Sequence, residues 1–186
     1  DRVERVVKDA VGVLLACGVA RRVGRLGHGR VAEYTGEQRL TGREHIYPDE
    51  ALAAFEAQIP FSLQRPDLQI DFCAAKNGGK ILDSYYEMTL ADAFVLDAGL
   101  SAEVEGYDAV CINSMSDSGL AALRSRLDIP VVGPGQACFL TASMLGHQFS
   151  VITMWDRWKP LYRKVALELE MQNRLVSIES IDTRPD

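Results

Sequence analysis

The chain has 186 residues, of which 47% are hydrophobic, and a formal net charge of -6 at pH 7. This length and apolar content suit one complete hydrophobic core, or one core and part of a second. The negative charge and the lack of a basic stripe argue against a nucleic-acid partner, and no apolar run approaches the length of a membrane span.

The cysteines and histidines show no Cys-x-x-Cys pair and no metal-ligand spacing, so we expect no metal site. Free cysteines within apolar patterns usually pack as small hydrophobic residues. Unpaired cysteines also fit a reducing, cytoplasmic setting. The residues concerned are Cys17, Cys73, Cys111, Cys138, His28, His45 and His147.

Residues 1–42 differ in charge from the rest of the chain, with eight Lys/Arg against five Asp/Glu. The apolar run 11–20 predicts a helix over about residues 3–23, weakened by Gly12 and Gly18. Acidic residues before the run argue against a signal peptide. We leave this basic amino-terminal segment unassigned.

The next part of the chain predicts a helix, a strand and a second helix. The first helix begins near Tyr47, with Pro48 in its first turn. Residues 68–73 alternate apolar and polar side chains, as a strand does, and a turn follows at 77–79. Ser84 then suits the amino-terminal cap of a helix that runs to about residue 105.

From residue 106 onward, short apolar strands alternate with helical patterns. Such repetition predicts an α/β fold with a parallel sheet flanked by helices. In chain order the elements are strand 109–112, helix 119–127, strand 128–133, helix 137–145, strand 149–153, helix 156–172 and strand 175–178.

Polar side chains gather directly after the strand 109–112. Asn113, Ser114, Ser116 and Asp117 stand between that strand and the next helix. Ligands of parallel α/β sheets bind at the carboxyl ends of strands, so these residues are candidates for a functional site. The alternative is an ordinary loop rich in helix-cap residues.

Four stretches of the sequence carry a resemblance to a known family: 82–87, 106–120, 129–137 and 146–153. In this order they resemble the aspartate/glutamate/hydantoin racemase superfamily, and its hydantoin racemase branch most of all. The resemblance covers about residues 66–186. It implies a doubly wound, flavodoxin-like first lobe over residues 43–147 and the truncated start of a second, similar lobe over 148–186.

The family's domain normally opens with a strand that ends in Asn-Pro-Asn and helps to bind the substrate. No such motif precedes Arg43. If this first strand is absent, the sheet lacks one member and the site lacks half of one binding wall.

Members of this superfamily epimerise a carbon beside a carbonyl without a cofactor, using two cysteines on opposite faces of the substrate. The resemblance therefore implies no cofactor, a homo-oligomer, and a small-molecule substrate such as a hydantoin, an amino-acid derivative or a carboxylate. Ser114 occupies the position of the first cysteine, and a serine hydroxyl is a far poorer base than a thiol. The second cysteine would lie beyond residue 186.

Other contacts are implied by the same resemblance, each with an alternative. Thr153 also suits a helix cap. Apart from the resemblance, Cys138 lies at a predicted helix start that could lower its pKa, or it packs in the core. Cys111 faces away from the site by its strand offset. The implied substrate-binding residues are Asn113, Met115, Ser116, Tyr85, Gly133, Gly135, Gln136 and Thr153.

Three functions stay open at this point. The first is a racemase of the hydantoin or amino-acid type. The second is a decarboxylase or isomerase of the same superfamily that needs only one cysteine, which would suit Ser114. The third is a non-catalytic protein that binds a small carboxylate or cyclic amide.

Overall fold

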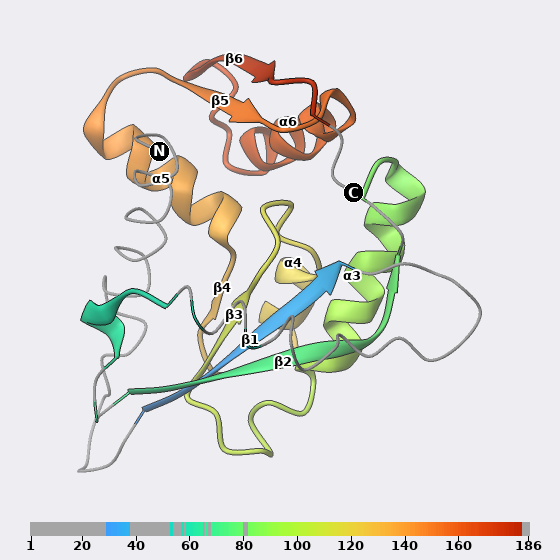
Figure 1. The fold of residues 1–186 in the computed structure, drawn as a ribbon, viewed down its shortest axis with the longest axis vertical. Helices are drawn as coiled ribbons and strands as arrows, with labels where there is room; N and C mark the ends of the chain where they lie inside the picture. Colours follow the sequence, from blue (N-terminus) through green and yellow to red (C-terminus); the bar gives the residue numbers. More distant parts are fainter. Residues whose placement is uncertain are drawn as a thin grey trace.

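The computed structural model describes residues 29–37, 53, 57, 59–64, 66, 68–79 and 82–183. Two sheets of parallel strands are present in this part of the chain, one of four strands and one of two (Figure 1). The elements are β1 (Gly29–Glu37), the 3-10 helix η1 (Phe61–Leu63), β2 (Leu68–Gly79), α3 (Tyr85–Gly99), β3 (Ala109–Ile112), α4 (Leu120–Arg124), β4 (Val131–Val132), α5 (Pro134–Leu145), β5 (Phe149–Thr153), the 3-10 helix η2 (Asp156–Trp158), α6 (Lys159–Glu168) and β6 (Leu175–Ser180).

The larger sheet has the strand order β2-β1-β3-β4, and each neighbouring pair is parallel. This is the order of a flavodoxin-like sheet, so the predicted α/β class is confirmed. The order reverses between β1 and β3. In such sheets, ligands bind outside the carboxyl ends of the strands at this switch point.

The sheet does have a strand before residue 42, although no Asn-Pro-Asn motif marks it in the sequence. Strand β1 lies inside the segment left unassigned and pairs with β2 on one side and β3 on the other. Its sequence hid it, because central parallel strands are usually continuous apolar runs, whereas Arg30 and Glu33 interrupt this one. The division of the chain into lobes at residues 147 and 148 stays a prediction.

Several predicted bounds change in the structure. Strand β2 continues through Gly79, where the sequence predicted a turn, and its register with β1 is irregular there. Helix α3 ends at Gly99, earlier than expected. Helix α5 starts at Pro134, where proline suits the first turn. The helices expected over 3–23 and from Tyr47 lie largely outside the described residues.

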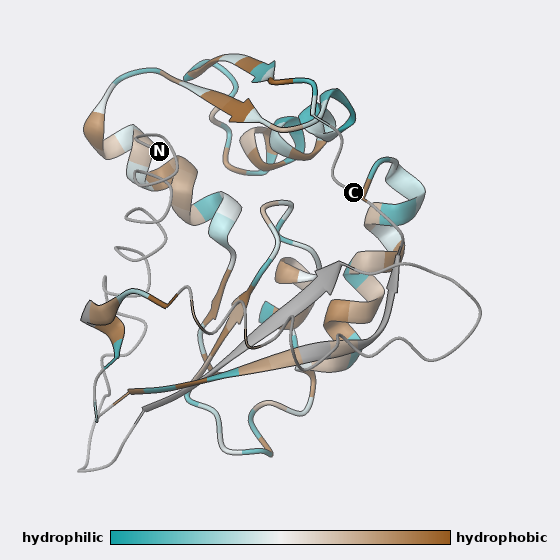
Figure 2. Ribbon diagram, viewed as in Figure 1, coloured by the Kyte–Doolittle hydropathy of each residue, from teal (hydrophilic) through white to brown (hydrophobic). Residues whose placement is uncertain are grey.

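The core of the first sheet joins β3 to the helices that pack on it. Val110 and Ile112 of β3 are fully buried together with Val95 of α3 and Leu123 of α4. Figure 2 shows hydrophobic residues along β3 and β4. Because its side chains are held in this cluster, β3 gives the loop that follows it a fixed starting point.

Helix α6 packs against both α3 and α5. Leu161 is buried with Met88 and Ala91 of α3, while Val165 lies in a second cluster with Phe139 of α5. Figure 1 shows α6 and the β5–β6 sheet above the larger sheet, with the β3–α4 loop between them. Among the described helices, none has the length and hydropathy needed to cross a membrane.

The first prediction concerns this core. Leu123→Ala removes a side chain with no exposed surface, so we expect the free energy of unfolding to fall by about 2–5 kcal/mol. Leu167→Ala is the matched control, because Leu167 is 63% exposed and should change stability by less than about 0.5 kcal/mol. Chemical denaturation measures both. Equal losses in the two variants would contradict the burial described here.

Candidate functional site

The candidate site is the loop between β3 and α4, at the carboxyl end of β3. Four of its polar residues are buried: Ser114, Ser116, Asp117 and Ser118. Buried polar groups must find hydrogen-bond partners, because leaving them unpaired costs free energy. The partners therefore define how the loop is held.

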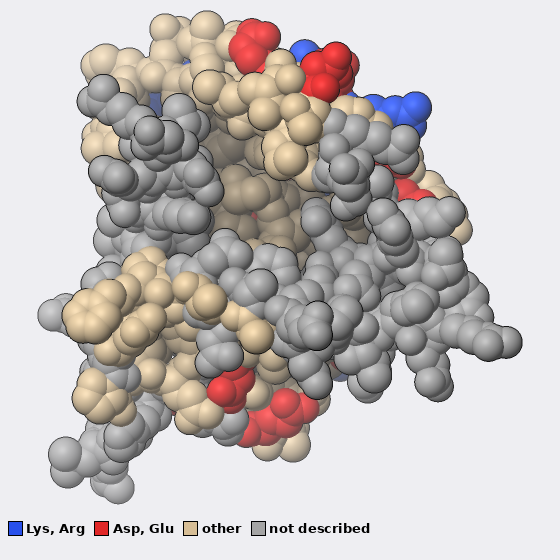
Figure 3. Space-filling model, viewed as in Figure 1, with Lys and Arg blue, Asp and Glu red and all other residues tan. Residues whose placement is uncertain are grey.

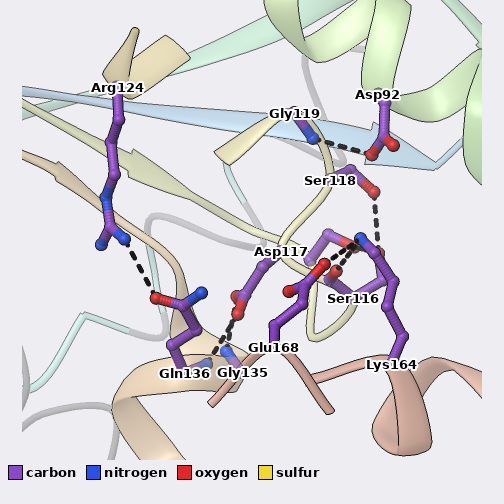
Figure 4. Close-up of polar contacts among 11 residues, drawn as sticks. Asp92, Ser116, Asp117, Ser118, Gly119, Arg124, Gly135, Gln136, Lys164 and Glu168 are labelled. Atoms are coloured by element: carbon purple, nitrogen blue, oxygen red, sulfur yellow. Dashed lines mark hydrogen bonds and ion pairs between the residues drawn. The ribbon is translucent and has the colours of Figure 1, made fainter. Parts of the chain in front are cut away.

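Three serine hydroxyls form a hydrogen-bonded chain through the loop. Ser114 Oγ lies 2.7 Å from Ser116 Oγ, which lies 2.7 Å from Ser118 Oγ. In Figure 4, Ser116 and Ser118 lie on the same side of the loop, facing Lys164. The chain brings the predicted residue Ser114 into contact with Ser116, which was also predicted.

Asp117 ties the loop to the start of α5. Its Oδ1 accepts the backbone N–H of Gly135 at 2.7 Å, and its Oδ2 accepts that of Gln136 at 2.6 Å (Figure 4). A carboxylate is favourable at a helix amino terminus, where N–H groups lack partners within the helix. Gly133 and Gly135 permit this approach, because a Cβ at either position would overlap the Asp117 carboxylate.

Burial raises the pKa of Asp117 from 3.8 to about 6, against the lowering effect of its hydrogen bonds to Gln136 and Gly135. The positive charge of Lys164 also lowers this pKa, and the negative charge of Glu168 raises it. Desolvation disfavours the charged form more than the donors favour it. Asp117 is therefore a buried acid that titrates near neutral pH.

Two further helices hold the loop. Lys164 of α6 donates from Nζ to the backbone oxygen of Ser116 at 3.2 Å and lies 3.6 Å from Glu168 Oε1. Asp92 of α3 accepts the backbone N–H of Gly119 at 2.8 Å. Together with the Asp117 contacts, these bonds join the loop to α3, α5 and α6.

The predicted substrate-binding residues differ in their surroundings. Met115 packs against the apolar cluster around α5 and α6, and Thr153 is buried and donates to Tyr162 Oη at 3.4 Å. Gln136 accepts a bond from Arg124 Nη1 at 3.0 Å. Tyr85 is 74% exposed at the start of α3, and Asn113 is half-buried. Their roles in binding stay predictions.

The described cysteines near this loop are half-buried. For Cys138, burial and the charge of Asp117 raise the pKa, so the lowering that a helix start could give does not prevail. Among the described residues, no three His, Cys, Asp or Glu side chains come together as metal ligands.

Sequence reasoning assigned no role to Ser118, Lys164 or Glu168 and left Asp117 out of the binding residues. Asp117 did carry a signal, since it follows a strand of a parallel sheet. Lys164 carried none, because it lies 48 positions from Ser116 in sequence and meets it only in the folded chain.

The surface over this region is concave. Figure 3 shows a hollow beneath the layer of β5, β6 and α6, and the described residues seen within it are mostly uncharged. A hollow beside the carboxyl ends of parallel strands fits the position expected for a ligand.

Residues 50–185 match the model of the Asp/Glu/Hydantoin racemase family. The chain belongs to this family. It is 35% identical to a hydantoin racemase of Pseudomonas sp. (strain NS671) over 119 residues, which are 64% of this chain and 48% of that protein. It is 27% identical to a hydantoin racemase of Paenarthrobacter aurescens over 103 residues, 55% of this chain and 44% of that protein. The chain thus spans about half the length of these relatives.

Solved structures of the same fold include two allantoin racemases. That of Klebsiella pneumoniae superposes with a TM-score of 0.70 at 20% identity, over 83% of this chain and 59% of its own. That of Pseudomonas fluorescens superposes with a TM-score of 0.66 at 23% identity, over 83% of this chain and 61% of the allantoin racemase chain. The flavodoxin-like strand order described above therefore belongs to a fold shared with racemases.

A second prediction follows from the contacts of Asp117. Asp117→Asn leaves one of the two N–H groups at the start of α5 without an acceptor, so we expect a loss of about 1–3 kcal/mol in the free energy of unfolding. The comparison is made at about pH 4.5, where the native carboxyl is protonated and neither side chain bears the cost of a buried charge. Asp97→Asn, on an exposed position of α3, is the matched control and should change stability little. Urea denaturation measures both, and a neutral effect at position 117 would contradict the role given to this carboxylate.

The pKa of Asp117 generates a third prediction. The folded protein binds the Asp117 proton more tightly than the unfolded chain does, so binding of this proton stabilises the fold. That contribution to the free energy of unfolding is fully present below about pH 3.8 and is lost as the pH rises through about 6. The test is chemical unfolding of the native chain and of Asp117→Asn between about pH 3.5 and about pH 7.5. The free energy of unfolding of the native chain should fall with pH relative to that of Asp117→Asn. Asp97→Asn should show the same fall as the native chain.

Proposed function

We propose that the protein is a cofactor-independent, racemase-like isomerase that acts at a carbon beside a carbonyl. The proposed substrate is a hydantoin or another amino-acid derivative. Membership in the Asp/Glu/Hydantoin racemase family supports this reaction class, and two similar proteins are hydantoin racemases. The observation that carries the proposal is the buried polar loop at the strand-order switch point, with Ser114 directly beyond the end of β3.

The loop offers hydrogen-bond donors for such a reaction. Removing a proton beside a carbonyl places negative charge on the carbonyl oxygen, and donors fixed in a partly dry site stabilise that charge. The Ser114 hydroxyl is nearly buried, and the cation of Lys164 lies beside the same loop. These groups would bind and orient the substrate and stabilise the charge on its oxygen.

Ser114 is poorly placed to act as the base. Its hydroxyl bonds to that of Ser116, and among the described residues it has no histidine or carboxylate partner that would take its proton. A serine hydroxyl without such a partner does not ionise near neutral pH. We therefore assign the proton transfer to a family cysteine in the half of the relatives' length that this chain does not span.

The serine at position 114 also favours a second candidate, a decarboxylase or isomerase of the same superfamily that uses a single cysteine. Such an enzyme needs one proton donor, and its first loop needs only to hold a carboxylate or enolate. A small-molecule substrate, a homo-oligomeric state and a cytoplasmic setting belong to both versions of the proposal.

A fourth prediction tests the proposed reaction. The full-length protein in D2O should abolish the optical rotation of enantiopure 5-substituted hydantoins and introduce deuterium at C5. Ser114→Cys should raise this rate by about ten-fold or more, because a thiol is far more readily ionised than a hydroxyl. Ser125→Cys, on an exposed residue after α4, should leave the rate unchanged.

The negative outcomes also discriminate. No loss of rotation across a panel of hydantoins would overturn the racemase proposal. Release of carbon dioxide from a disubstituted malonate would favour the one-cysteine candidate. Binding of either compound without turnover would favour a non-catalytic protein.

A further inference from the structure

The serine chain in the β3–α4 loop has a gradient of exposure. Ser118 is 1% exposed, Ser116 is 2% exposed, and Ser114 is 7% exposed. The two oxygen–oxygen distances of 2.7 Å are typical of hydroxyl hydrogen bonds. Only the Ser114 end of the chain lies near the surface.

Each hydroxyl has one proton and can accept two hydrogen bonds, so three arrangements are possible: the bonds run from Ser114 to Ser118, they run the other way, or both end hydroxyls donate to Ser116. The last arrangement leaves the proton of Ser116, which is 2% exposed, without a partner among the described residues. If Ser114 donates to Ser116 and Ser116 to Ser118, then the buried proton of Ser118 needs another acceptor. Among the described residues, Ser118 Oγ has no hydrogen-bond partner besides Ser116. That direction leaves a buried donor unpaired, which costs free energy.

The opposite direction leaves unpaired only the proton of Ser114, the most exposed of the three serines. Ser118 donates to Ser116, Ser116 donates to Ser114, and only the Ser114 proton is left for a partner outside the chain. We infer that Ser118 and Ser116 are positioning residues that turn the Ser114 hydroxyl into a hydrogen-bond donor, so that position 114 binds an acceptor oxygen of the ligand. A carbonyl, carboxylate or enolate oxygen has this chemistry.

One further contact holds the middle of the serine chain in place. Lys164 donates to the backbone oxygen of Ser116, which fixes the residue at the middle of the chain and places a positive charge beside it. Hydrogen bonds in series also polarise one another, so a hydroxyl that accepts one bond becomes a better donor in the next. The direction of the serine hydrogen bonds does not depend on the proposed function. The choice of a hydantoin as the ligand does rest on the proposed function.

Neutron diffraction from D2O-exchanged crystals of the unliganded, full-length protein tests the direction without any substrate. The expected deuterium positions are on Ser118 Oγ toward Ser116, on Ser116 Oγ toward Ser114, and on Ser114 Oγ away from Ser116. Deuterium on Ser114 Oγ directed at Ser116 would overturn the inference, whether or not the protein is a racemase.

Ligand binding tests the consequence. Ser118→Ala should weaken the binding of 5-benzylhydantoin by about five-fold, the effect of one lost hydrogen bond, and Ser118→Thr, which keeps the hydroxyl, should restore it. The infrared stretch of the 13C-labelled ligand carbonyl should rise in Ser118→Ala and rise further in Ser114→Ala, because each loses donation to that oxygen. Ser125→Ala, away from the chain, should change neither quantity.

The outcomes separate the two proposals. If 5-benzylhydantoin fails to bind the native protein while the neutron positions are as expected, then the hydantoin substrate is wrong and the inference stands. If it binds, but its carbonyl stretch is the same in the native protein and in Ser114→Ala, then Ser114 does not donate and the inference fails.

Discussion

The carboxylate of Asp117 accepts two backbone N–H groups at the start of α5, and the geometry of the site depends on this pair of hydrogen bonds. They hold Asp117 in a left-handed backbone conformation, with φ of 54°, which residues other than glycine rarely adopt. They also require glycine at positions 133 and 135, since a side chain at either would overlap the carboxylate. One acidic residue thus sets the path of its own loop and the residues allowed in the next.

The loop is also where separate parts of the chain meet. Helix α3 reaches it through Asp92, and α6 reaches it through Lys164. Behind it, Ile112 anchors β3 in the core. A loop held from several sides can keep hydroxyl groups in fixed directions, which is what stabilising charge on a substrate oxygen requires. Packing and polar contacts therefore both fix the β3–α4 loop in place at the strand-order switch point.

Under the proposed function, Ser114 stands where the resemblance implies a family cysteine, and this changes what the loop can do. A thiol at this position could exchange a proton, whereas the hydroxyl is better suited to donate a hydrogen bond. Cys138 does not supply a substitute, because burial and the nearby Asp117 charge raise its pKa. We therefore propose that the loop is a binding and charge-stabilising element. Under this description, the proton transfer of a racemase depends on a group elsewhere in the protein.

The sequence by itself determined the type and order of the strands and helices from residue 82 onward, though not all of their bounds, because their apolar spacing and caps are local. It also placed Ser114 and Asp117 after a strand, and with them the region of the site. It did not reveal β1, whose charged residues mask a strand that is specified by its neighbours on both sides. Nor could it show that Lys164 donates a hydrogen bond to Ser116, or that the Asp117 carboxylate accepts the N–H groups at the start of α5. Those contacts, the burial that raises the pKa of Asp117, and the order of the serine hydroxyls depend on distances between residues far apart in sequence, and only tertiary packing decides them.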